Sequence, residues 1–311
     1  MEIFNKLEDI KTRPSVVLAI GSFDGLHRGH RKILGIVRTK AEELGVKSMI
    51  ITFAPTPREV LSGQKEVALM KPEEKTDAIE ASGIDMLVLK HFDLEFAKMD
   101  PETFLNRLLT YLDLKVLVAG PDHSIGKKDE AGIKFLKKSA EAHDFELIVV
   151  DKTQYKGFDI SSQLIRKTLK DGKIDDVSTM LGYNYRISGT VIPGQQRGRT
   201  MGFPTLNIDP DMRSCIIPGF GVYCVSVKLG KDRYNGICNI GIRPTFAEDE
   251  LTMEVHVLEK DLEHQYNKHV EIRFKHFVRE ERKFDTMDAL IEQINRDIKK
   301  CKILTEEKCQ H

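Results

Sequence analysis

The stretch Val16-Val17-Leu18-Ala19-Ile20-Gly21-Ser22-Phe23-Asp24-Gly25-Leu26-His27-Arg28-Gly29-His30 decides how the first half of the chain folds. Its first five residues form an apolar run without a polar face, which is typical of a strand buried on both sides of a sheet. The glycines that follow predict a tight turn, and a helical pattern over residues 30–44 ends at Gly45. A buried strand, a turn and a helix are the first unit of an α/β fold.

The same alternation continues to residue 150. Helical patterns are predicted at residues 72–83, from Pro101 onward and at 132–143, with Asp100 as an N-cap and Pro101 at the first helical position. Apolar runs lie around these helices at residues 49–53, 86–89, 116–119 and 147–150. Strands that alternate with helices pair in parallel through right-handed crossovers. We therefore expect a doubly wound α/β sheet.

After residue 151 the pattern changes. Residues 161–181 predict two short helices separated by Asp171-Gly172, with Gly182 ending the second. From Tyr185 onward the period becomes two. Strands are expected at residues 186–192, 221–229, 234–240, 253–257 and 270–274. Short strands separated by Gly, Pro and Asn turns predict an antiparallel β-barrel, so we place one domain at residues 1–184 and the other at 185–311.

The chain ends in a predicted amphipathic helix. Its apolar residues fall at helical spacing: Met287, Leu290, Ile291, Ile294 and Ile298. We interpret this stripe as a face packed on the barrel rather than as a partner-binding motif.

Composition narrows the class of protein. A length of 311 residues fits two domains, and 48 Lys and Arg balance 48 Asp and Glu, so the net charge is zero. A neutral chain argues against a nucleic-acid binder and against a polybasic membrane-surface protein. No apolar run reaches the roughly 18 residues of a membrane span, and acidic residues at the N-terminus do not fit a signal peptide. The five cysteines form no Cys-x-x-Cys pair, so neither a zinc site nor a disulfide framework is indicated.

The glycines and histidines after the first strand predict a phosphate site. Gly21 and Gly25 let backbone amides approach an anion, at the place where doubly wound sheets bind phosphates. His27 and His30 are three residues apart at a helix start, so both imidazoles can point to one side, and Gly29 leaves room for a nucleotide. A metal site is the weaker interpretation, because two imidazoles without a convergent carboxylate or thiolate bind a metal poorly.

This stretch resembles the Gly-x-Phe-Asp-Gly-x-His-x-Gly-His signature of the bifunctional bacterial riboflavin kinase and FMN adenylyltransferase (FAD synthetase) family. The second adenylyltransferase motif of that family, Ser-Ser-Thr-x-Ile-Arg, is similar to Ser161-Ser162-Gln163-Leu164-Ile165-Arg166. The resemblance implies that His27 and His30 stabilise charge on the transferred group and that Asp122 contacts the flavin. It implies that the nucleotide is bound by Gly21, Phe23, Asp24, Gly25, Gly29, Ser161, Ser162 and Arg166.

The second half resembles the riboflavin kinase of the same family. Gly202-Phe203-Pro204-Thr205-Leu206-Asn207 is similar to its Gly-x-Pro-Thr-Ala-Asn pattern, and residues 189–199 are similar to the glycine-rich flap before it. Thr205 and Asn207, two apart on an extended segment, aim two oxygens at one side, which suits Mg²⁺ and a nucleotide phosphate. The resemblance adds Gly198 and Arg199 as nucleotide contacts.

Two more stretches carry the kinase resemblance. Glu254 stands where the family places the carboxylate that activates the riboflavin hydroxyl, so it is the expected catalytic residue. Val278-Arg279-Glu280-Glu281-Arg282-Lys283-Phe284 is similar to a Leu-Arg-x-Glu-x-Lys-Phe segment, which makes Arg279 an expected flavin contact.

The first half also departs from the family pattern. Thr52-Phe53-Ala54-Pro55-Thr56-Pro57 stands in place of Thr-Phe-Asp/Glu-Pro-His-Pro, and residues 122–129 lack the aromatics of Asp-Phe-x-Phe-Gly. A lost acid, a lost imidazole and lost aromatics change how an adenylyltransferase pocket would hold a flavin.

The resemblance implies a nucleotidyltransferase-type doubly wound sheet and a transferase, monomeric or weakly oligomeric, that uses ATP and Mg²⁺ to convert riboflavin to FMN and then FMN to FAD. Since the sequence shows neither a membrane span nor a signal peptide, we expect the protein in the cytoplasm. Its partners are these small molecules, without nucleic acid or membrane. Two alternatives stay open. One is a riboflavin kinase whose adenylyltransferase domain is weak or altered in specificity, and the other is a non-catalytic flavin-binding regulator.

Overall fold

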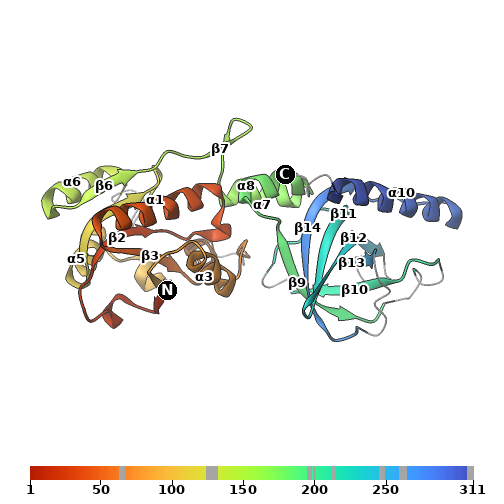
Figure 1. Cartoon of the computed structure of the whole chain (residues 1–311), viewed down its shortest axis with the longest axis horizontal. Coiled ribbons are helices and arrows are strands. Elements are labelled where there is room, and N and C mark those ends of the chain that lie inside the picture. Colours follow the sequence, from red (N-terminus) through yellow and green to blue (C-terminus); the bar gives the residue numbers. More distant parts are fainter. Residues whose placement is uncertain are drawn as a thin grey trace. The chain divides into compact units, whose positions relative to one another are not determined.

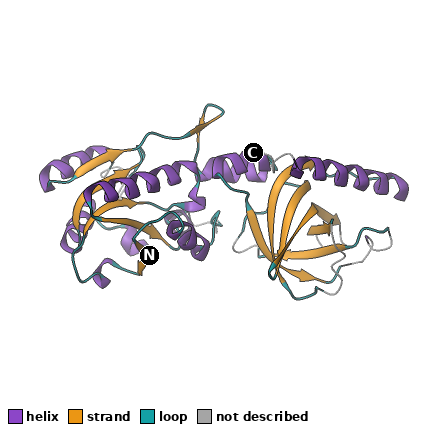
Figure 2. Ribbon diagram, viewed as in Figure 1, coloured by secondary structure: helices purple, strands orange, loops and turns teal. Residues whose placement is uncertain are grey.

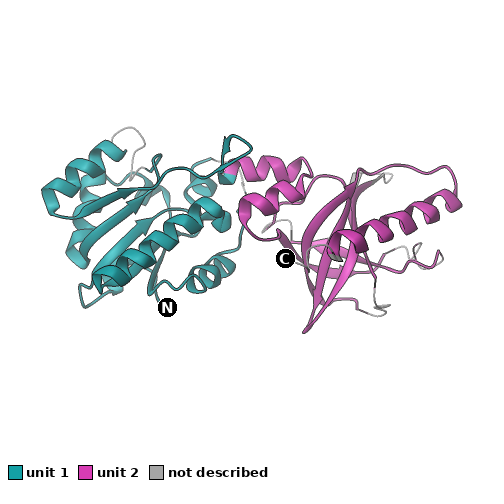
Figure 3. Cartoon of the chain, turned by 45° about the horizontal axis from the view of Figure 1, so that its top comes forward, with its two compact units in different colours: residues 1–162 teal, residues 163–311 magenta. Residues whose placement is uncertain are grey.

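The computed structural model describes residues 1–62, 67–123, 132–194, 198, 201–211, 215–244, 249–258 and 265–306. The chain divides into two compact units, Met1–Ser162 and Gln163–His311 (Figure 3). This division falls at the start of helix α7 (Ser162–Lys170). Helices α7 and α8 (Ile174–Leu181), which the sequence pattern assigned to the first domain, therefore belong to the second unit. No helix within these ranges is long and apolar enough to cross a bilayer.

The first unit contains a six-stranded parallel sheet, as predicted (Figure 1). Its strands lie in the order β1 (Glu2–Phe4), β4 (Met86–Lys90), β3 (Lys47–Phe53), β2 (Ser15–Ile20), β5 (Asp113–Ala119) and β6 (Glu146–Val149). The chain leaves β2 toward β3 and later returns to β5 on its other side, so the strand order reverses beside β2. Ligands of such sheets bind at the carboxyl ends of the strands at this reversal.

Helices cover both faces of this sheet (Figure 2). On one face the even-numbered residues of β2 pack with α5 (Pro101–Tyr111) and α6 (Ile133–His143). The odd-numbered residues of β2 point the other way, where α1 (Arg28–Leu44) packs on β2 and β3. The predicted caps are confirmed: Gly45 ends α1 in the left-handed conformation and the Asp100 carboxylate accepts the Thr103 amide at 2.9 Å.

Several short elements of the first unit lack a clear sequence signal. They are β1, the 3-10 turns Leu7–Asp9 and Asp24–Leu26, α2 (Pro57–Leu61), α4 (Leu94–Ala97) and the hairpin of β7 (Gln154–Tyr155) and β8 (Phe158–Asp159). Helix α3 (Pro72–Glu80) is shorter than its predicted span.

The second unit contains the predicted barrel. It closes in the order β10 (Thr205–Pro210), β13 (Asp249–Val257), β12 (Asp232–Pro244), β11 (Gly221–Leu229), β14 (His269–Arg279) and β9 (Arg186–Ile192). All its pairs are antiparallel. Strand β10 joins β9 to β13, so the extended segment expected at Thr205 and Asn207 is the strand that closes the barrel.

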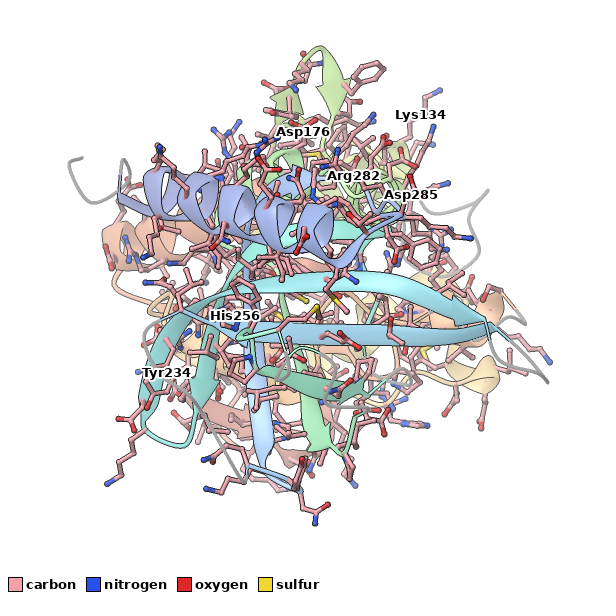
Figure 4. All side chains as sticks on the ribbon, turned by 90° about the vertical axis from the view of Figure 1, so that its right-hand side faces the viewer. Lys134, Asp176, Tyr234, His256, Arg282 and Asp285 are labelled. Atoms are coloured by element: carbon pink, nitrogen blue, oxygen red, sulfur yellow. The ribbon has the colours of Figure 1, made fainter. Side chains whose placement is uncertain are left out.

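The C-terminal helix α10 (Met287–Glu306) lies against the outside of the barrel wall (Figure 4). Near its end, Cys301 and Ile298 pack with Val222 and Cys224 of β11 and Ile237 of β12. Leu290 and Ile294 line a cavity beside the barrel strands. The prediction of a packed stripe is confirmed for Ile298. It is wrong for Met287, which is 58% exposed at the first turn of the helix.

Candidate active sites

The residues predicted to bind phosphate in the first unit lie in the loop after β2. Phe23, Gly25 and Leu26 all have positive φ angles of 45°, 74° and 37°, so the chain turns sharply back on itself. The Phe23 ring is buried against Gly21, where an added Cβ would lie 3.2 Å from the ring. The Gly21 amide donates to the Ile51 carbonyl of β3 at 3.0 Å, so the loop is anchored to the neighbouring strand.

His27 and His30 point to one side, as predicted. Their rings stack with centroids 3.6 Å apart and planes 18° apart. The His27 ring caps helix α1 by accepting the His30 amide at Nδ1, at 3.4 Å. Because Nδ1 is the acceptor, the proton of the neutral His27 ring lies on Nε2. A Cβ at Gly29 would lie 3.2 Å from the same ring, so glycine lets the rings stack beside the backbone.

Both imidazoles are neutral near pH 7. Burial lowers the pKa of His27 to about 4. Burial lowers the pKa of His30 well below its usual value, and the charges of His27 and Lys75 lower it further. The Nδ1 atom of His30 is buried and has no hydrogen-bond partner within the described part of the chain. Without a bound anion, the pair therefore offers N–H donors rather than cations.

Asp24 connects the loop to the second predicted motif. Its carboxylate is buried and accepts the Leu69 amide at 2.8 Å, just before α3. Its carbonyl accepts the Ser162 hydroxyl at 3.0 Å. Ser161 is exposed beside Ser162, whereas Arg166 is buried on α7 and belongs to the second unit.

Lys75 is a functional candidate that the sequence motifs missed. It is 3% exposed on α3, and its ammonium donates to the Ser22 carbonyl at 3.1 Å and the Phe53 carbonyl at 2.7 Å. The Thr52 hydroxyl donates to the same Ser22 carbonyl at 3.0 Å. The available signal was its position four residues before Ile79, on the buried face of the helix.

The residues expected to contact the flavin in the first unit do not line a closed pocket. The Asp122 side chain is 76% exposed and pairs with Lys152 at 2.6 Å, which also contacts Asp159 at 3.1 Å. Thr56, which stands where the family pattern has an imidazole, caps α2 together with Glu59. Residues 124–129 lie outside the described ranges.

The second unit holds a cavity of about 440 Å³ between the barrel strands and α10. Its polar lining includes most of the residues predicted for the kinase site. They are Gly198, Thr205, Asn207, Glu254 and Arg279, joined by Asn239, His256, Glu281, Arg282 and Asp297. Arg199 lies outside the described ranges.

Strand register places the polar groups of this cavity in a row. Glu254 of β13 is directly opposite Asn207 of β10 on one side and Asn239 of β12 on the other. Two residue pairs further along the same strands, Thr205 is opposite His256. The His256 ring (Figure 4) holds the strand start through Nδ1, which lies 2.9 Å from the Pro204 carbonyl. A carboxylate therefore lies between two amide side chains and beside a hydroxyl.

Glycines let the flap approach this row closely. A Cβ at Gly194 would lie 2.0 Å from the Asn207 Nδ2 atom, and one at Gly198 would lie 2.3 Å from the Phe203 carbonyl oxygen. The Gly198 carbonyl in turn accepts the Phe203 amide at 2.8 Å. Only glycine fits where the backbone passes over the side chains that would meet a phosphate.

Arg279 is fixed by a buried acid that the motifs did not indicate. Its Nε atom lies 2.9 and 3.2 Å from the two carboxylate oxygens of Asp297 on α10, which is 4% exposed. Gln293 donates to the same carboxylate at 2.7 Å and accepts from Arg282. The network attaches α10 to the cavity wall and aligns the Arg279 guanidinium.

Comparison with known proteins places both units in one family. The FAD synthetase family model matches residues 9–164 and the riboflavin kinase family model matches residues 181–305. The chain is 36% identical over 284 residues to the bifunctional riboflavin kinase/FMN adenylyltransferase of Listeria monocytogenes, with 90% of each chain covered. It is 36% identical over 286 residues to that of Bacillus subtilis, again with 90% of each covered.

A solved structure shows the same combination of folds. A crystal structure described as a macrolide-efflux protein from Streptococcus pneumoniae matches with a TM-score of 0.84 at 27% identity, covering 96% of this chain and 97% of that one. The two family models together match most of the chain, and the relatives match nearly all of it. The chain belongs to the bifunctional riboflavin kinase/FMN adenylyltransferase family.

Proposed function

We propose that the barrel cavity phosphorylates riboflavin to FMN and that the loop after β2 adenylylates FMN to FAD. The observation that carries the proposal is the register of β10, β13 and β12, which sets the Glu254 carboxylate between two amide side chains in a cavity of about 440 Å³. A base beside phosphate-binding groups is what phosphoryl transfer to an alcohol requires.

In the barrel, Glu254 accepts the proton of the riboflavin 5′-hydroxyl as its oxygen attacks the γ-phosphorus of ATP. The bond to the β-phosphate oxygen breaks and ADP leaves. A carboxylate is a weak base for an alcohol, so positioning must supply much of the rate. Asn207, Asn239 and the flap amides orient the two reactants.

The residues present fit a magnesium ion. Thr205 and Asn207 line the cavity and would supply the oxygen ligands that Mg²⁺ prefers. When bound, Mg²⁺ neutralises charge on the phosphates. Arg279, held by Asp297, would contact the flavin.

In the first unit, an FMN phosphate oxygen attacks the α-phosphorus of a second ATP and pyrophosphate leaves. His27 and His30 donate N–H groups to the transferred phosphate. Ser162 holds the loop by donating its hydroxyl to the Asp24 carbonyl. The role of Arg166, which belongs to the second unit, stays a prediction.

One variant in each unit tests this division of labour. Glu254→Gln should lower FMN formation about a hundredfold or more while FAD formation from supplied FMN survives, and His30→Ala should do the reverse. Each product is separated by chromatography, and thermal unfolding checks that the variant is folded. Loss of both activities from either folded variant would show that the two sites are not assigned correctly.

A second candidate is a riboflavin kinase whose FAD step is slow. It is favoured by Thr56, whose hydroxyl caps α2, and by Asp122, whose carboxylate pairs with Lys152. Incubating one preparation with FMN and ATP, and another with riboflavin and ATP, separates the two candidates by the ratio of the initial rates. The cytoplasmic location, the monomeric or weakly oligomeric state and the absence of nucleic-acid partners stay predictions.

A further inference from the structure

The buried ammonium of Lys75 lies beneath the loop that the proposed adenylyl transfer uses. Lys75 extends from α3 and is 3% exposed. It donates to the carbonyls of Ser22, two residues after β2, and of Phe53, the last residue of β3. Strands β2 and β3 are neighbours, so one cation joins their carboxyl ends.

Packing alone does not explain a cation at this position. Moving an ammonium out of water costs several kcal/mol unless strong partners replace its hydration. The Lys75 ammonium donates to two neutral carbonyls, and the charges of Asp24 and Glu59 act on it. An apolar side chain of similar length would fill the same space without this cost, so the charge itself has a use.

The use follows from the neutral histidines. His27 and His30 supply donors but no positive charge in the ligand-free site, whereas FMN and ATP bring several negative charges to it. The charge of Lys75 lowers the pKa of His30, so the two side chains are close enough to interact electrostatically. A fixed cation under the loop attracts phosphates and keeps the imidazole as a neutral donor.

We propose that Lys75 is a positioning residue for adenylyl transfer. Its ammonium ties Ser22 to Phe53, and it supplies the positive charge behind the loop that the neutral His27 and His30 lack. This inference rests on the proposed function of the first unit.

The titration of Lys75 gives a signature in the wild-type protein. Burial lowers its pKa to about 8, and the carboxylates of Asp24 in the Asp24–Leu26 turn and Glu59 in α2 oppose that shift. The other titratable group facing it is His30 in α1, which is neutral across this range. Lys75 is charged below pH 8, so kcat/KM for ATP in FAD formation should fall about fivefold from pH 8 to pH 9.

Two variants separate the charge from the hydrogen bonds. Lys75→Gln keeps an N–H donor without charge, and Lys75→Met removes both. We expect each to lower kcat/KM for FAD formation at pH 7 by about a hundredfold and to abolish the fall between pH 8 and pH 9. Lys137→Met, which removes an exposed lysine from α6 of the same unit, should keep the wild-type rate and profile.

A binding measurement keeps this inference separate from the proposed reaction. ATP phosphates should raise the pKa of Lys75, so calorimetry in buffers of different ionisation enthalpy should detect proton uptake at pH 8 that Lys75→Gln lacks. ATP binding in the barrel contributes equally to both proteins, so it cancels when the proton uptake of Lys75→Gln is subtracted from that of the wild type. Proton uptake without FAD formation would contradict the proposed reaction but support the role of Lys75. A wild-type rate in Lys75→Gln, or equal proton uptake in both proteins, would overturn the inference.

Discussion

Gly194→Ala should impair the kinase site by displacing one side chain. A Cβ at residue 194 would lie 2.0 Å from the Asn207 Nδ2 atom and 2.3 Å from its Cγ atom, whereas ordinary contacts begin at 3.4 Å. Either the amide or the flap backbone must therefore move by about 1.4 Å, the difference between 2.0 and 3.4 Å. Asn207 is directly opposite Glu254, so the movement occurs next to the proposed base.

The expected effect is large for FMN formation and absent for FAD formation. A misplacement of about 1 Å in a group that orients reactants can cost about a hundredfold in rate. We therefore expect Gly194→Ala to lower kcat/KM of FMN formation about a hundredfold and to raise the Mg²⁺ concentration needed for half the maximal rate. FAD formation from supplied FMN should be unchanged, since residue 194 lies in the other unit.

A double mutant shows whether the loss acts through Asn207. Initial rates of FMN formation are measured for Gly194→Ala, Asn207→Ala and the pair, and the pair should be no slower than Asn207→Ala alone. Gly230→Ala is the matched control. Its φ is 61° and an added Cβ meets nothing within 4 Å, so it should cost about 1 kcal/mol of stability and leave the kinetics unchanged. The reasoning would be refuted if the double variant lost activity by the product of the two single factors, or if Gly194→Ala formed FMN at the wild-type rate.

Three further predictions concern other side chains. His256→Asn keeps a donor near the ring Nδ1 position and should stay within about threefold of the wild-type FMN rate, whereas His256→Gln should lose about tenfold. Asp297→Asn leaves a guanidinium without its buried counter-charge, so it should destabilise the barrel by about 3 kcal/mol in denaturant titrations and raise KM for riboflavin more than KM for ATP. The contribution of His27 and His30 to the stability of the first unit should be constant above pH 6.5 and be lost toward pH 4, because the unfolded imidazoles bind protons in this range and the buried ones do not. A smaller fall in His30→Asn would confirm the source in urea titrations at pH 7.5 and 5.

The parts of the fold that repeat could be predicted from the sequence. Apolar runs such as residues 16–20 have no polar face because both faces of β2 are covered, and the alternation at residues 253–257 follows from a strand with one face in the barrel core. Strand β1 escaped prediction because three residues are too few to show a period. Met287 was misplaced because helical spacing identifies an apolar stripe but not how far the barrel beneath it extends.

The candidate site divides in the same way. Motif spacing indicated His27 and His30, which are neighbours both in the sequence and in space. Glu254 was indicated only by the family resemblance, because its neighbours Asn207 and Asn239 are distant in the sequence. Lys75 and Asp297 reach their sites from helices far along the chain. Lys75 meets the loop only because α3 packs beside it, and Asp297 meets Arg279 only because α10 crosses the barrel. Local patterns carry no information on such tertiary contacts.

The departures at Ala54 and Thr56 affect one substrate of the first unit more than the other. Thr56 caps α2 through the Glu59 amide, so the segment keeps its fold without the imidazole of the family pattern. The nucleotide side is built from other elements: the loop after β2, α1 and the Lys75 contact from α3. The change of sequence therefore removes polar groups near the end of β3 and leaves the phosphate-binding loop intact. Any loss of efficiency in FAD formation should accordingly lie in KM for FMN, with KM for ATP kept by the unchanged loop.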